Sequence, residues 1–145
     1  MMNAKPLCGI DEAGRGPLAG SLVIAGVVLK NPIEGLMDSK KLTEKRREAL
    51  YPLVIENSVY HIVSFSSQEV DKMGISKCLQ AGLQSIQKHL SEVDYLFDGN
   101  STFGVENIRT MIKADTKVAE VSAASILAKV THDREMIEMA EKYPE

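Results

Sequence analysis

Apolar positions along the chain follow two different spacings. Short runs rich in β-branched residues predict strands, whereas apolar residues three and four positions apart predict helices. The predicted strands cover residues 7–11, 21–29, 59–66, 93–97 and 107–113. The predicted helices cover 43–57, with Thr43 as N-cap, 67–90 and 118–142. This order predicts an α/β fold with a mixed five-stranded sheet flanked by helices.

Length and composition indicate one globular domain over residues 1–145, since 44% of the chain is hydrophobic and 26% is charged. No apolar run approaches the ~20 residues that span a bilayer, and the N-terminus lacks the apolar core of a signal peptide. We therefore expect a soluble cytoplasmic protein. Cys8 and Cys78 are expected to pack as small hydrophobic residues without a disulfide.

Charged residues gather where the first predicted strand ends. Asp11 and Glu12 close an apolar run and are followed at once by a glycine-rich turn that contains Arg15. Adjacent carboxylates repel each other, so cations are expected beside them, and glycines let the chain come close to a large anion. The turn lacks the Gly-Lys-Ser/Thr ending of a P-loop and precedes a strand, which excludes both common nucleotide-binding loops. Metal and phosphate are the ligands that this stretch favours.

Two further acids, Asp98 and Asp115, also follow predicted strands. Oxygen ligands from several strand ends suit Mg²⁺ or Mn²⁺, and a pair of such ions is typical of phosphodiester hydrolysis. Each acid taken alone is more typical of a solvated turn, and Asp98-Gly99 is a common turn signal, whereas Asp11-Glu12 is set apart by the glycine-rich turn that follows it. The net charge of −3 argues mildly against a protein that binds nucleic acid mainly through a basic surface. Acidic metal ligands, however, make the net charge more negative without preventing phosphate contacts.

Several motifs in order resemble one family. Residues 9–20, GIDEAGRGPLAG, resemble the opening signature of prokaryotic ribonuclease HII, the type 2 ribonuclease H. The later matching blocks are DSKKL at 38–42, DGN at 98–100, AD at 114–115, SAASILAKVT at 122–131 and DR at 133–134. The chain departs from the family at Ser21, where proline is common. Relatives also continue past residue 145 with a segment carrying lysines, a histidine and a tyrosine, so we expect a truncated chain.

This resemblance implies an RNase H-like fold and an endonuclease for RNA–DNA hybrids and for ribonucleotides embedded in duplex DNA, cut on their 5′ side. The family's metal-binding catalytic acids, which hold Mn²⁺ or Mg²⁺, correspond to four residues here, namely Asp11, Glu12, Asp98 and Asp115. Its ribose-reading motif corresponds to Gly14, Arg15 and Gly16, and the 2′-hydroxyl that it reads is what distinguishes RNA from DNA. By the same similarity Ser39 and Lys40 contact the substrate, and the chain is expected to be a monomer.

Two other functions remain open at this stage. A truncated chain could bind nucleic acid with weak or no catalysis, and a related fold could carry another nuclease or phosphatase. The last predicted helix carries a polar stripe formed by Ser122, Ser125, Lys129 and Asp133. This stripe either faces the candidate site or is solvent-exposed, with an ion pair between Lys129 and Asp133. His61, His89 and His132 are interpreted as structural or surface residues.

Overall fold

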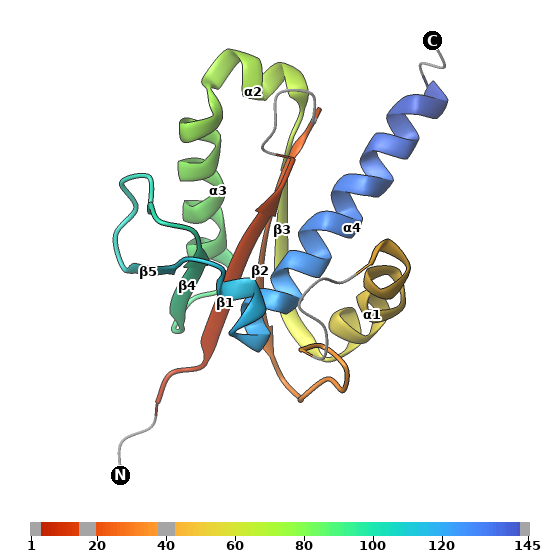
Figure 1. Cartoon of the computed structure of the whole chain (residues 1–145). Helices are drawn as coiled ribbons and strands as arrows, with labels where there is room; N and C mark the ends of the chain where they lie inside the picture. Colours follow the sequence, from red (N-terminus) through yellow and green to blue (C-terminus); the bar gives the residue numbers. More distant parts are fainter. Residues whose placement is uncertain (1–3, 15–19, 38–42, 143–145) are drawn as a thin grey trace.

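The computed structural model describes residues 4–14, 20–37 and 43–142, and its centre is a five-stranded mixed sheet (Figure 1). The strands lie in the order β3-β2-β1-β4-β5. Their bounds are β1 Leu7–Ala13, β2 Leu22–Leu29, β3 Ser58–Phe65, β4 Asp94–Asp98 and β5 Ile108–Met111. β1 pairs with β2 and β2 with β3 in antiparallel register, whereas β4 runs parallel to β1 and β5 parallel to β4. The α/β class and the mixed five-stranded sheet are thus confirmed.

Helices cover both faces of this sheet (Figure 1). They are α1 Glu44–Glu56, α2 Ser67–Met73, α3 Ile75–His89 and α4 Ala119–Lys142, with a 3₁₀ turn, η1, at Ala114–Thr116. Thr43 caps α1 as predicted, since its hydroxyl accepts a hydrogen bond from the backbone N–H of Arg46 at 3.1 Å. Within the described residues no helix is long and apolar enough to cross a membrane.

The prediction of one continuous helix over 67–90 is wrong. Gly74 separates α2 from α3 and has a φ of +88°, which lies outside the helical region. Its N–H still bonds to the carbonyl of Val70, so it ends α2 as a C-cap before α3 begins at Ile75. The apolar spacing continues across the glycine because both helices pack on the same side of the sheet, which hides the break from a periodicity analysis.

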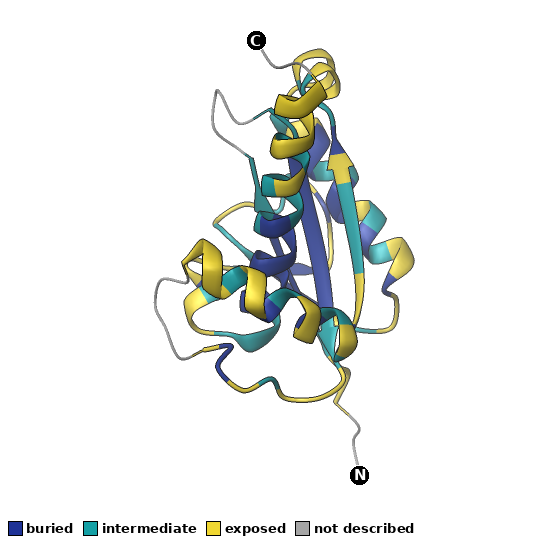
Figure 2. Ribbon diagram, turned by 90° about the vertical axis from the view of Figure 1, so that its right-hand side faces the viewer, coloured by how far each residue is buried: buried dark blue, intermediate teal, exposed yellow. Residues whose placement is uncertain are grey.

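The two larger apolar cores of the described residues lie one on each face of the sheet, and a smaller cluster joins Leu96, Ala114 and Val121. Alternate β1 residues, Cys8 and Ile10, pack with α3 on one face, and α4 with α1 covers the other. Cys8 and Cys78 are both buried and free, as expected. Figure 2 shows how burial changes along α4: its first half is buried against the sheet, and its last turns are exposed.

The start of α4 lies directly on β1. A Cβ atom added to Gly9 would come within 2.3 Å of the backbone of Glu120 and Val121, so only glycine permits this contact. The close approach places η1, which immediately precedes α4, beside the carboxyl ends of β1 and β4. This is the edge of a parallel strand pair at which α/β folds place their ligands.

Candidate metal centre

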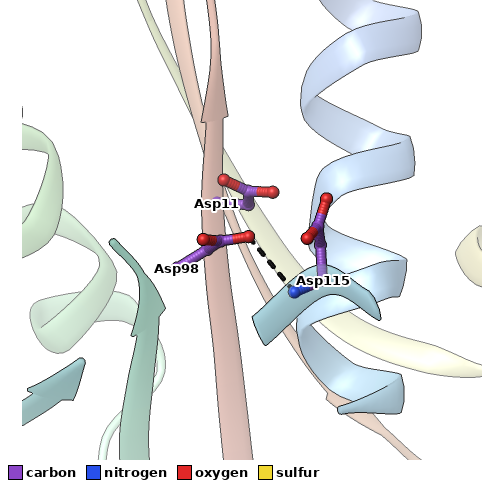
Figure 3. A group of neighbouring side chains, drawn as sticks. All are labelled: Asp11, Asp98 and Asp115. Atoms are coloured by element: carbon purple, nitrogen blue, oxygen red, sulfur yellow. Dashed lines mark hydrogen bonds between the residues drawn. The ribbon is translucent and has the colours of Figure 1, made fainter. Parts of the chain in front are cut away.

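Three carboxylates converge at this edge of the sheet (Figure 3). Asp11 lies near the end of β1, and Asp98 is the last residue of the parallel neighbour β4. The pairing of Ile10 with Phe97 places Asp11 and Asp98 at the next position of the same register. Asp115 comes from η1, so three separate elements each contribute one acid.

The three side chains are close enough to share a ligand. One carboxylate oxygen from each of Asp11, Asp98 and Asp115 lies within 4.8 Å of the others. The backbone N–H of Asp115 donates a hydrogen bond to Asp98 Oδ2 at 3.1 Å, and that of Glu12 donates to Asp11 Oδ1 at 2.8 Å. These bonds hold two of the carboxylates in place while leaving further oxygen lone pairs available.

The electrostatics of this cluster are unfavourable for its charged form. Burial raises the pKa of Asp11 to about 8, and the neighbouring charges of Asp98, Glu12 and Asp115 add to that rise. Burial also raises the pKa of Asp98, as does its side-chain hydrogen bond with Asp115, because two carboxyl groups can form such a bond only by holding a proton. Among residues 4–14, 20–37 and 43–142, no salt bridge joins a lysine or arginine to these three carboxylates.

These properties fit a divalent cation. The donors are hard oxygen atoms from carboxylates, which Mg²⁺ and Mn²⁺ prefer, and they are held within one ligand-sized space. A cation between them would replace repulsion by attraction, and would displace the proton that Asp11 otherwise holds at neutral pH. The predicted site residues Asp11, Asp98 and Asp115 therefore meet where a metal centre is expected.

Glu12 is not part of this group of three in the structure. β1 continues to Ala13, so strand alternation assigns Glu12 to the face of Cys8 and Ile10 and Asp11 to the face of α4. Its charge still contributes to the raised pKa of Asp11. The role of Glu12 as a fourth ligand stays a prediction.

Of the predicted substrate contacts, Gly14 lies within the described residues, and Arg15, Gly16, Ser39 and Lys40 lie outside them. Gly14 has a φ of +90°, a conformation that favours glycine. A Cβ atom added there would meet Ser21 O at 2.1 Å and the ring of His132 at 2.7 Å. The requirement for glycine at position 14 is therefore set by packing within the chain.

The polar stripe on α4 divides into two parts. Ser122 and Ser125 are buried, and the hydroxyl of Ser122 donates to the carbonyl of Leu36 at 3.3 Å. Asp133 pairs with Arg47 at 3.9 Å, so its partner comes from α1 and not from Lys129. The proximity of His132 to Gly14 could not be predicted from the sequence, since helical spacing does not indicate which loop a helix contacts.

Comparisons with known proteins identify the family of this chain. The family model described as Ribonuclease HII matches residues 8–145. A ribonuclease HII from Sulfurovum sp. is 79% identical over 141 residues, covering 97% of this chain and 75% of the relative. One from Aliarcobacter butzleri is 54% identical, covering 97% and 74%.

Solved structures give the same result. The RNase HII in the PCNA:RNase HII complex from Archaeoglobus fulgidus superimposes with a TM-score of 0.83 at 29% identity, covering 97% of this chain and 79% of that one. The ribonuclease H2 from Pyrococcus horikoshii gives 0.79 at 31% identity, covering 96% and 77%. The match to the family model over nearly the whole chain, together with these relatives, shows that the chain belongs to the ribonuclease HII family, the type 2 ribonucleases H.

Proposed function

We propose that this ribonuclease cleaves by a two-metal mechanism, hydrolysing the RNA strand of RNA–DNA hybrids and cutting on the 5′ side of ribonucleotides embedded in duplex DNA. The observation that carries the proposal is the convergence of Asp11, Asp98 and Asp115 without a salt-bridged cation among the described residues. Such a cluster is costly for the fold unless a ligand of opposite charge uses it.

Asp11, Asp98 and Asp115 would hold Mg²⁺ or Mn²⁺, with Glu12 as the predicted fourth ligand. Two such ions would supply a nucleophilic water at neutral pH and stabilise the charge on the leaving 3′ oxygen. The protein's part is to fix the ligand oxygens before the metal arrives. The N–H groups of Glu12 and Asp115 do this for Asp11 and Asp98, because each donates to a carboxylate oxygen.

Substrate recognition is assigned to the chain that follows β1. Gly14, Arg15 and Gly16 are proposed to read the ribose 2′-hydroxyl, since the glycines of this motif have no side chain that would keep backbone groups away from a sugar. Ser39 and Lys40 are proposed to contact phosphates, which would add affinity and salt dependence but no sequence preference. Gly14 lies three residues after Asp11, so ribose recognition would take place next to the metal centre. We further propose that the chain acts as a monomer in the cytoplasm.

The test is cleavage of a labelled DNA duplex that contains a single ribonucleotide, with Mg²⁺, with Mn²⁺ and with EDTA. We expect a metal-dependent cut on the 5′ side of the ribonucleotide and none in the matched all-DNA duplex. Cleavage of the all-DNA duplex would contradict ribose recognition. Binding of the ribonucleotide duplex without any product, at any metal concentration, would identify a non-catalytic nucleic-acid-binding chain instead.

A further inference from the structure

One turn of α4 lies against both ends of the segment that connects β1 to β2. The segment's described ends are Gly14 on one side and Gly20 with Ser21 on the other. A Cβ atom on Gly14 would lie 2.7 Å from the His132 ring, and one on Gly20 would lie 2.7 Å from the sulfur of Met136. Both ends of the connection therefore pack on the same helical turn.

Between these two contacts, Glu135 makes two hydrogen bonds at once. Its Oε1 accepts from the Ser21 hydroxyl at 2.8 Å, and its Oε2 accepts from the Ser64 hydroxyl at 2.7 Å. Ser21 precedes β2 and Ser64 lies near the end of β3, so one carboxylate links α4 to two neighbouring strands. Each oxygen of the Glu135 carboxylate therefore has its own hydroxyl partner.

Ser21 also lies in contact with Gly14. The carbonyl oxygen of Ser21 would be only 2.1 Å from a Cβ on Gly14, so the two backbones are in close contact. Because no space separates the two backbones, we expect a displacement of Ser21 to alter the position of Gly14, which lies three residues after Asp11. Glu135 therefore contacts Ser21, and Ser21 contacts Gly14.

We propose that Glu135 is a positioning residue that sets, through Ser21, where Gly14 lies relative to the metal centre. This inference rests on the proposed function, in which Gly14 belongs to the ribose-reading motif. The bond from residue 21 to this carboxylate is made by the hydroxyl of Ser21, so the proposed positioning depends on the serine at this position. Placement within a fraction of an ångström governs how well a reacting group is oriented, which gives such a contact a role in substrate binding.

The chain provides a matched pair of variants. Ser21→Ala and Ser64→Ala each remove one hydroxyl that donates to Glu135, but only Ser21 touches Gly14. Amide hydrogen exchange of residues 13–14 and 20–22 measures how often the two ends of the connection open, without reference to activity. We expect Ser21→Ala to raise that exchange about tenfold and Ser64→Ala to leave it near the wild-type rate.

Steady-state kinetics on the single-ribonucleotide duplex provide the second readout. We expect Ser21→Ala to raise KM about fivefold, the effect of losing one hydrogen bond, with kcat nearly unchanged. Ser64→Ala should keep wild-type kinetics, and Glu135→Ala, which loses both bonds, should resemble Ser21→Ala. Equal effects of the two serine variants on exchange and on KM would overturn the proposal. They would show that Glu135 only stabilises the packing of α4 on the sheet.

The two proposals can fail separately. A wild-type chain that cleaves no ribonucleotide duplex would refute the proposed function and remove the basis for an effect on KM. The exchange experiment would still decide whether Glu135 holds Gly14 in place. If wild-type cleavage is normal and Ser21→Ala changes neither exchange nor KM, the positioning role of Glu135 is wrong and the ribonuclease function stands.

Discussion

The aspartates at the ends of β1 and β4 and the two histidines between β3 and α3 are both groups of like side chains held in contact, but their surroundings differ. The rings of His61 and His89 stack with centroids 3.8 Å apart and planes inclined by 11°. Both rings bond to Ser85: His61 Nε2 lies 2.9 Å from its hydroxyl, and His89 Nδ1 donates to its carbonyl at 2.9 Å. Neutral rings in this arrangement do not repel each other, so the contacts within the chain are enough to hold the two histidines together without a ligand.

The aspartates have no such compensation among the described residues. Asp11 is only 7% exposed and faces two other carboxylates. Apart from the side-chain bond between Asp98 and Asp115, the bonds that Asp11 and Asp98 receive come from backbone N–H groups. Stability alone would favour a neutral side chain at such a position. A close group of like titratable side chains therefore indicates a ligand when no other part of the protein compensates the repulsion between them.

The largest effect is expected from Asp98→Asn. The amide oxygen can still accept the Asp115 N–H bond, but the side chain can no longer hold a charged oxygen toward a cation. We expect cleavage in Mn²⁺ to fall about 10³-fold or more, measured under single-turnover conditions. Asp94→Asn, at the opposite and exposed end of the same strand, should keep wild-type activity. A loss below about tenfold in Asp98→Asn would mean that this aspartate is not a metal ligand.

Asp11→Asn should stabilise the metal-free protein. The pKa of Asp11 in the folded chain is about 8, above its ordinary value of 3.8, so the folded state binds the proton more tightly than the unfolded state. The free energy of unfolding of the wild type should therefore fall as pH rises through this window, at up to ~1.4 kcal/mol per unit. The asparagine variant lacks this titration and should be about 2 kcal/mol more stable than the wild type at pH 8 in EDTA.

Urea unfolding at pH 5 and pH 8 measures this difference, with Asp94→Asn as the exposed control. The variant's advantage should be small at pH 5, where Asp11 is protonated in the folded wild type. An Asp11→Asn protein that is less stable than the wild type at pH 8 would show that the cluster's repulsion is compensated, and would remove the contrast with the histidines.

Metal binding should turn the destabilising repulsion among the three aspartates into a net stabilisation of the folded chain. Mn²⁺ at about a hundred times its dissociation constant should stabilise the folded chain by about 2.7 kcal/mol, and Asp115→Asn should lose most of this gain. Since the pKa of Asp11 is about 8, binding at pH 7 should release a proton. Calorimetry in two buffers of different ionisation enthalpy should then give different heats at pH 7. Equal heats would show that Asp11 is already ionised in the metal-free chain.

Sequence reasoning located the aspartates because they mark strand ends, and β1 and β4, as parallel neighbours, bring Asp11 and Asp98 to the same edge. Asp115 was placed after a strand and lies in η1, where its own N–H reaches Asp98. Glu12 is predicted as a fourth ligand from its place between Asp11 and the glycine-rich turn and from the family resemblance, and this role stays a prediction. Adjacent residues in a strand point to opposite faces, and the extension of β1 to Ala13 keeps Glu12 within the strand.

The contacts around the β1–β2 connection could not be predicted in this way. Ser21 and Glu135 are 114 positions apart, and nothing in the period of α4 indicates which of its polar residues meets a strand. The break at Gly74 was missed for a related reason, because apolar periodicity reports a shared packing face and not the continuity of the backbone. Local patterns predict elements and their faces, whereas contacts between distant elements need the fold.

The smallest effect is expected at the histidine pair. Burial lowers the pKa of His61, and the neighbouring His89 lowers it further, so the folded state binds the proton less tightly than the unfolded state, whose pKa stays near 6.5. The stabilising contribution is present above that value and is lost as pH falls through 6.5 toward the folded pKa. Thermal unfolding at pH 7 and pH 5 should therefore show a smaller loss of Tm for His61→Gln than for the wild type. His89→Gln should give an intermediate loss, since it removes the like charge and leaves His61 to titrate. If His61→Gln lost as much stability as the wild type between these pH values, the stacked pair would not be the neutral, self-satisfied group that the comparison with the aspartates requires.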